Sequence, residues 1–181
     1  MNIEINNKSL SLELLRNILT EDIAISLSKG TKEKITHSSK YVINKSEGND
    51  SIYGINTGFG NLANVKIDKS DLNKLQRNLV SSHAVGVGEL LPNKIVKLII
   101  VLKIYALAQG YSGASLVLVE RLCEFINLEL YPCIPSKGSV GASGDLAPLA
   151  HLSQALIGEG YVNYKGVKLS ASKALAKSNL K

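Results

Sequence analysis

The sequence predicts a mainly α-helical chain that carries long glycine-rich loops and one short β-hairpin. Apolar residues recur three and four positions apart over most of the chain, which is the period of a helix that buries one face. Two glycine-rich segments, 48–64 and 138–145, interrupt this pattern. The 181 residues have the length of one ordinary domain with a core of its own.

The first half of the chain is expected to hold three helices. Ser11 can cap the first, whose apolar residues from Leu12 to Leu19 share one face, and a more polar helix runs from about 31 to 45. Residues 48–64, with four glycines, then form a loop, and a loop of this length inside a domain is more often functional than accidental. Ser70 starts a third helix, which ends before Gly86 and Gly88.

The second half is expected to hold three more helices, the hairpin and a weak terminal helix. Pro92 opens a long apolar helix that Gly110 closes, and another helix covers about 115–127. The next helix has Asp145 as its cap and Pro148 in its first turn, residues 161–169 form the hairpin, and 170–181 are weakly helical with no obvious packing partner. The apolar face predicted for the long helix comprises Ile95, Leu98, Ile99, Leu102 and Ala106.

Composition excludes several functional classes. The net charge of +6 comes from 18 Lys and 3 Arg spread along the chain, whereas a nucleic-acid site concentrates basic residues and favours Arg. The longest apolar run, 98–102, is far too short to cross a membrane. Two isolated cysteines, Cys123 and Cys133, fit neither a zinc site nor a disulfide scaffold. We therefore expect a cytoplasmic protein without nucleic-acid, membrane or metal partners.

The segment 138–145 is the most informative motif, and its residues permit three interpretations. It could bind a phosphate through backbone N–H groups, although the P-loop spacing is absent, or it could be a tight turn without other function. The third interpretation is a self-cyclisation of Ala142-Ser143-Gly144. The Gly144 nitrogen attacks the Ala142 carbonyl, and loss of water there and of the Ser143 hydroxyl leaves a methylidene-imidazolone ring.

Three blocks, in one order along nearly the whole chain, resemble the aromatic amino-acid ammonia-lyases and aminomutases. Residues 138–151 are similar to the family's signature, 53–60 to its catalytic-tyrosine loop, and 79–88 to its substrate-selectivity segment. The resemblance implies the N-terminal domain of the ammonia-lyase fold. It also implies that Ala142, Ser143 and Gly144 form 4-methylidene-imidazol-5-one (MIO), a dehydroalanine-type electrophile, so that no external cofactor is needed.

Tyr53 and His83 are the two side chains that the resemblance assigns to substrate chemistry. Tyr53 matches the base that removes a β-proton; because a free tyrosine has a pKa of about 10, its loop must supply donors or positive charge. From the residues alone, Tyr53 is as plausibly a packed ring and His83 a polar cap. Ser82-His83 is typical of family members that act on L-histidine, giving urocanate and ammonia, with tyrosine or phenylalanine lyases and aminomutases as alternatives.

The resemblance also suggests supporting roles for the neighbours of these residues. The residues expected to order the tyrosine loop, the cyclising turn or its following helix are Asn56, Thr57, Gly60, Gly141 and Asp145. We expect His151 to be structural.

We expect residues 1–181 to be one N-terminal lyase domain, incomplete at its C-terminus, because the family's downstream motifs and central helical bundle are missing. By itself such a domain is expected to be inactive, either as part of a homotetrameric or split enzyme with a partner supplying the rest, or as a silent remnant. Active sites in the family combine several subunits, so Tyr53 and Ser143 should lie far apart in one chain. The apolar stripes at 95–106 and 116–126 should stay partly exposed.

Overall fold

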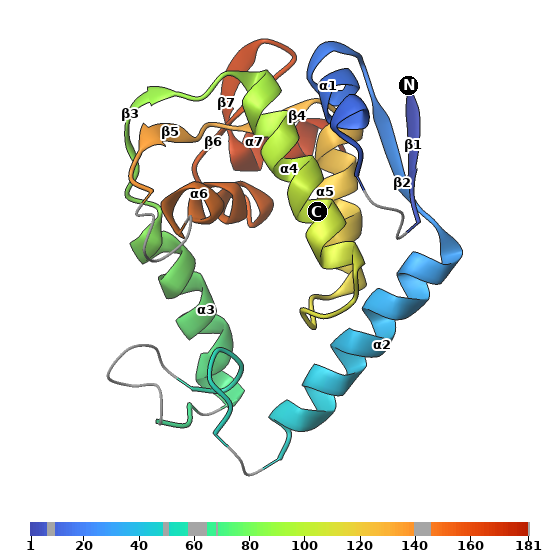
Figure 1. Cartoon of the computed structure of the whole chain (residues 1–181). Helices are drawn as coiled ribbons and strands as arrows, with labels where there is room; N and C mark the ends of the chain where they lie inside the picture. The colour runs from blue at the N-terminus through green and yellow to red at the C-terminus, as the bar shows by residue number, and fades with distance from the viewer. Residues whose placement is uncertain (7–9, 49–50, 58–64, 68, 140–145, 181) are drawn as a thin grey trace.

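The computed structural model describes residues 1–6, 10–48, 51–57, 65–67, 69–139 and 146–180, with no side-chain description at Lys69. This part of the chain is predominantly helical, as predicted (Figure 1). The helices are α1 (Leu12–Thr20), α2 (Lys29–Ser46), α3 (Lys69–His83), α4 (Asn93–Ala108), α5 (Leu116–Asn127), α6 (Leu146–Leu156) and α7 (Ala171–Lys177).

Serine side chains cap three of these helices. Ser11 accepts from the Leu14 amide at 3.1 Å and Ser115 from the Leu118 amide at 3.3 Å, which confirms both predicted starts. Ser28 accepts from the Thr31 amide at 3.2 Å, so α2 begins two residues before the predicted position. The serine hydroxyl satisfies an amide that has no partner within its helix.

The strands form three small sheets, of which the sequence predicted only the last hairpin. They are β1 (Asn2–Ile5) parallel to β2 (Ala24–Leu27), β3 (Val87–Leu90) antiparallel to β5 (Pro135–Lys137), and the sheet β4 (Leu130–Pro132), β6 (Tyr161–Tyr164) and β7 (Val167–Ser170). Lys165 and Gly166, both at positive φ, form the tight turn between β6 and β7. The other pairs join segments far apart in sequence, so no short window of residues shows them.

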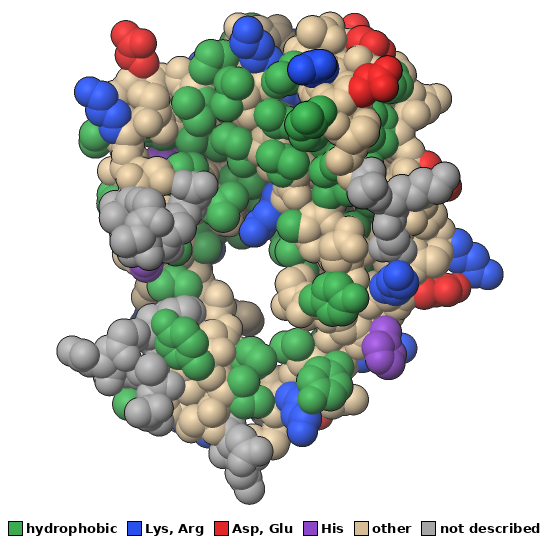
Figure 2. Space-filling model, viewed as in Figure 1, with side chains coloured by type: hydrophobic (Ala, Val, Ile, Leu, Met, Phe, Trp, Pro, Cys, Tyr) green, Lys and Arg blue, Asp and Glu red, His purple; other side chains and the backbone are tan. Residues whose placement is uncertain are grey.

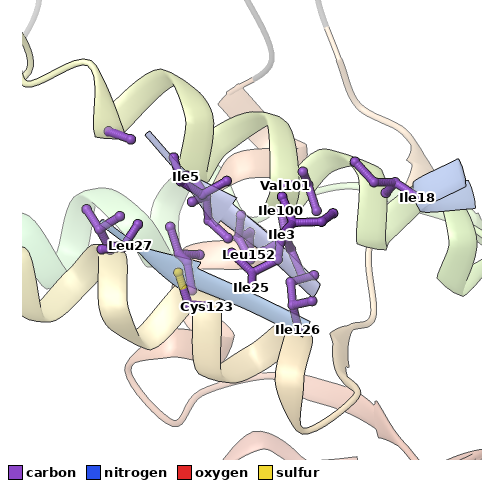
Figure 3. Packing of buried hydrophobic residues seen from close by; sticks show 14 of the residues in the cluster. Ile3, Ile5, Ile18, Ile25, Leu27, Ile100, Val101, Cys123, Ile126 and Leu152 are labelled. Atoms are coloured by element: carbon purple, nitrogen blue, oxygen red, sulfur yellow. The ribbon is translucent and has the colours of Figure 1, made fainter. Parts of the chain in front are cut away.

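The main core lies between α4, α5 and the β1–β2 pair, where isoleucines from all of them meet (Figure 3). The apolar stripe of α4 that the sequence indicated is not the buried face of this helix, and its expected partial exposure is confirmed. The buried residues are Val96, Ile100, Val101, Ile104 and Ala108, whereas Leu102 is 42% exposed and the rest of the predicted face is half-buried or exposed. Because α4 is apolar almost all round, periodicity cannot select its buried face.

By contrast, the expected exposure of the α5 stripe is wrong, because this helix buries Val119, Leu122, Phe125 and Ile126. Phe125 belongs to a second core cluster that packs the C-terminal elements against the body. This corrects the expectation that the last apolar elements lack a partner. The buried members of the cluster are Phe125, Leu130, Ala155, Val162, Ala171, Ala174 and Leu175.

Helices α2 and α3 project from the rest of the molecule, which is called the body below, and their far ends lie near one another (Figure 1). The space-filling view shows an opening between these two helices and the body (Figure 2). Helix α2 contacts α4 and α5, and helix α3 contacts α6. The described segments that carry predicted site residues therefore lie near the two ends of α3, with the Tyr53 segment before the helix and His83 at its end.

Candidate active site

The Tyr53 segment is closed by Asn56, whose Oδ1 accepts from the Ile52 amide at 2.7 Å. The Asn56 carbonyl in turn accepts from the Ile67 amide at 2.9 Å, and Thr57 forms a β-bridge with Lys66. Both Asn56 and Thr57 are 1% exposed. These contacts tie the loop to the chain just before α3. The supporting role of Asn56 and Thr57 toward Tyr53 stays a prediction, and Gly60 lies outside the described residues.

Tyr53 itself lies on the surface of this closed turn. Its side chain is 62% exposed, so it is not a ring buried in the domain. Gly54, at φ +77°, takes the left-handed conformation that the turn needs immediately after the tyrosine. The backbone is thus anchored while the phenol remains accessible to another surface or a substrate.

His83 is the last residue of α3 and is half-buried. Its Nδ1 lies 2.8 Å from the Leu79 carbonyl oxygen, which can only accept, so Nδ1 carries the hydrogen in this bond. In the neutral ring Nε2 is then the accepting nitrogen. A ring held in this way can present Nε2 to the N–H of another imidazole, which is the interaction predicted for a histidine substrate.

The chain after His83 lies against the segment that leads into the predicted MIO tripeptide. Strand β3 pairs with β5, and a Cβ on Gly138 (φ +135°) would lie 3.0 Å from the Gly86 Cα. This distance is tighter than nine in ten real Cβ contacts, and side-chain-bearing residues rarely adopt this φ, so both features favour glycine at position 138. The structure therefore brings together the selectivity segment and the approach to the MIO segment.

The residues predicted to form MIO lie outside the described residues. This applies to Ala142, Ser143 and Gly144, to the predicted turn residue Gly141 and to the predicted cap Asp145. Helix α6 begins at Leu146, directly after them, with Pro148 in its first turn as predicted. Their roles stay predictions.

The Tyr53 and His83 segments lie at opposite ends of α3. The tyrosine loop is bonded to residues 66 and 67 before the helix, and His83 ends it. A helix of 15 residues is about 22 Å long. The Tyr53 and His83 segments of one chain are thus a helix length apart. The expected separation of Tyr53 and Ser143 stays a prediction, because Ser143 lies outside the described residues.

Two polar residues, His151 and Glu159, make contacts with the His83 region that the sequence did not predict. His151 on α6 accepts at Nε2 from the Gly86 amide at 3.0 Å. Glu159, just beyond α6, binds Arg77 and Ser81 of α3. The sequence offered no signal for either contact, because the partners are 65 to 82 residues apart.

Other site chemistries find little support in the described residues. No group of three or more His, Cys, Asp or Glu in them could hold a metal ion. The cysteines are free thiols, and burial raises the pKa of Cys123 to about 12, which makes it a poor nucleophile. No helix in the described ranges has the length and apolar character to cross a membrane.

The fold and the grouping of these segments define a class of protein, that of the ammonia-lyases and aminomutases. The chain superimposes over its full length on a tyrosine aminomutase from Streptomyces globisporus, with a TM-score of 0.92, 32% identity and 34% of that chain covered. Over its full length it also superimposes on an ergothionase from Treponema denticola, with a TM-score of 0.95, 28% identity and 36% of that chain covered.

The sequence comparison narrows this class. The sequence model for aromatic amino acid lyases matches residues 10–181, and the chain belongs to this family. A histidine ammonia-lyase from Legionella pneumophila (strain Philadelphia 1) is 50% identical over 172 residues, which are 95% of this chain and 34% of that protein. The chain thus spans about a third of the length of the curated relatives it matches.

Proposed function

We propose that the chain is the N-terminal part of a histidine ammonia-lyase, which eliminates ammonia from L-histidine to give urocanate, the first step of histidine degradation. The observation that carries the proposal is the 50% identity with a histidine ammonia-lyase over 95% of the chain. The accepting Nε2 of His83 supports histidine over phenylalanine, since a phenyl ring has no donor to offer, whereas the phenol O–H of tyrosine can also donate to it.

Two side chains act on the substrate in this proposal. His83 Nε2 accepts a hydrogen bond from the substrate imidazole and so orients it. The Tyr53 oxygen takes the proton from the substrate β-carbon as a base. Tyr53 is accessible enough to serve an active site shared with other copies of the chain, and we propose a homotetramer, or a partner that supplies the remaining elements of the site.

The residues fit the self-formed MIO group that the family uses. Ala142-Ser143-Gly144 have the required chemistry, since Ser143 carries a hydroxyl that can leave and Gly144 has no Cβ to hinder its nitrogen. The close approach of Gly138 to Gly86 and the start of α6 at Leu146 place rigid elements on both sides of this segment. When formed, the group supplies an electrophile that makes the amine a better leaving group.

Two alternatives remain as outcomes of a test. A tyrosine or phenylalanine lyase or aminomutase is the first, because a tyrosine aminomutase shares the fold at 32% identity. The 50% identity to a histidine ammonia-lyase favours histidine. A catalytically silent remnant or split half is the second. The two free thiols fit a reducing compartment, and we propose a cytoplasmic location.

A chimeric enzyme tests the proposal directly. This chain replaces the matching N-terminal third of the Legionella pneumophila histidine ammonia-lyase, and histidine, tyrosine and phenylalanine are each offered as substrate. The α,β-unsaturated acid that each would give, urocanate from histidine, is followed by its ultraviolet absorbance. We expect urocanate from histidine and little product from the other two. A folded chimera with no activity favours the silent remnant, and preference for tyrosine or phenylalanine favours the other lyases.

The 181-residue chain by itself is the matched comparison. We expect it to release no ammonia from histidine, because the downstream motifs of the family are not in it. Urocanate formation by the pure chain would contradict this. The intact mass of the chain and of the chimera reports MIO formation, because cyclisation removes two waters.

A further inference from the structure

Two polar contacts, one with the last turns of α3 and one with the chain just after it, hold the residues on either side of His83, and both come from α6 or the turn that follows it. The first involves Glu159 and the second His151. Between them lie only the residues from Ser81 to Gly86. The position of His83 relative to α6 is therefore set at two points, one before it and one after it in the chain.

Glu159 makes the contact before His83 and binds two residues of α3 with one carboxylate. Its Oε1 accepts from Arg77, 2.7 Å from Nε and 2.6 Å from Nη2, and its Oε2 accepts from the Ser81 hydroxyl at 3.1 Å. The Glu159 amide donates to the Gln154 carbonyl at 2.8 Å, which anchors this turn to the end of α6. The carboxylate thus links the exit of α6 to the last turns of α3.

His151 makes the contact after His83, and its ring leaves almost no free space beside Gly86. Its Nε2 accepts from the Gly86 amide at 3.0 Å, so the ring must be neutral, with its hydrogen on Nδ1. A Cβ on Gly86 would lie 3.0 Å from this Nε2 and 3.2 Å from the Pro135 Cβ. Gly86 is therefore held between α6 and the entrance to β5.

We propose that His151 and Glu159 are positioning residues, which set where His83 lies relative to α6. This inference rests on the proposed function. An element that orients a substrate must be held to well within 1 Å, and a displacement of that size costs about 100-fold in rate. Helix α3 has no buried side chain at its described positions, so directional contacts must supply the precision that burial does not.

The test uses four variants in the chimeric enzyme: His151→Leu, His151→Gln, Glu159→Ala and, as the control, Ser153→Ala. The Gln oxygen can replace Nε2 as an acceptor, whereas Leu cannot. Ser153 is on the same helix and donates only to Leu149 of α6 in the described contacts. The KM separates a positioning role from a loss of folded protein, because fewer active molecules lower the apparent kcat and leave KM unchanged.

We expect His151→Leu and Glu159→Ala to raise the KM for histidine roughly 10-fold, and His151→Gln and Ser153→Ala to leave it within about 3-fold. If His151→Leu does not fold, Glu159→Ala still tests the inference, because it removes only the solvent-accessible Arg77–Glu159 pair and the Ser81 hydrogen bond. An unchanged KM in both His151→Leu and Glu159→Ala, or an equal rise for His151→Leu and His151→Gln, would overturn the inference. A parent chimera that forms no urocanate would instead overturn the proposed function.

Discussion

Helices α4 and α3 are of similar length but are held in the molecule by different forces. Helix α4 buries five apolar side chains in the main core. Helix α3 buries none at its described positions, and its apolar residues Leu72, Leu75, Leu79 and Val80 are half-buried. Its contacts with α6 and the turn that follows include the Arg77–Glu159 ion pair and the Ser81–Glu159 hydrogen bond.

The difference between the two helices shows that apolar burial and polar contacts do different work, since burial supplies stability and polar contacts supply precise placement. Burial of a large apolar side chain contributes about 2–5 kcal/mol when measured by truncation, whereas an exposed ion pair contributes about 0.2–1 kcal/mol. Polar contacts are directional, however, and fix a distance and an angle that apolar packing leaves adjustable. The body of the molecule therefore supplies the stability, and α3, which carries His83, depends on a few directional contacts for its placement.

The largest expected effect is a loss of kcat that leaves the stability of the fold unchanged. Ser143→Ala in the chimeric enzyme removes the hydroxyl whose loss completes the ring, so kcat should fall by more than about 1,000-fold. The intact mass should then no longer show the loss of two waters. Circular dichroism and the unfolding midpoint should match the parent. Normal turnover by this variant would remove the basis of the mechanism.

A core truncation should affect the two helices very differently. Ile104→Ala in α4 leaves a cavity at a fully buried site and should lower the free energy of unfolding by about 2–5 kcal/mol. Leu72→Ala in α3 removes a half-buried side chain and should cost roughly 1 kcal/mol. Urea unfolding of the 181-residue chain measures both. Equal losses would contradict the distinction drawn between the helices.

His83→Leu should change catalysis more than stability. Without the accepting Nε2, the substrate N–H loses a partner worth roughly 1–3 kcal/mol, so kcat/KM for histidine should fall about 10- to 100-fold. The unfolding midpoint should move little, because the side chain is at a helix end and half-buried. Unchanged kinetics with histidine would return His83 to a purely structural role.

The smallest expected effect is a pH dependence from His151. Burial lowers the pKa of this imidazole below its ordinary value of 6.5, so the folded state favours the neutral ring that accepts from Gly86. Its contribution to stability is present above pH 6.5 and is lost as the pH falls through the lowered pKa. Urea midpoints between pH 7 and pH 5 should fall more in the parent chain than in His151→Gln. A parallel decline in both would contradict this.

The sequence predicted local features well because each is encoded by neighbouring residues. The Ser11 cap, the start of α5 near residue 115 and the turn at Lys165-Gly166 depend on contacts within a few positions. The predictions failed where the outcome depended on remote partners. The buried face of α4 is one case, since the residues that cover it come from α1, α2 and α5.

The candidate site divides in the same way. The sequence by itself determined its chemistry, because Tyr53, His83 and Ala142-Ser143-Gly144 are recognised as residue types in contiguous motifs. Only the tertiary structure decided which motifs meet. The Gly86 segment lies against Gly138 and His151, whereas the Tyr53 turn is anchored at the opposite end of α3. The physical reason is that reactivity belongs to individual groups, while proximity depends on how helices pack. The end of α3 and the chain just after it are held by contacts with residues 65 to 82 positions away.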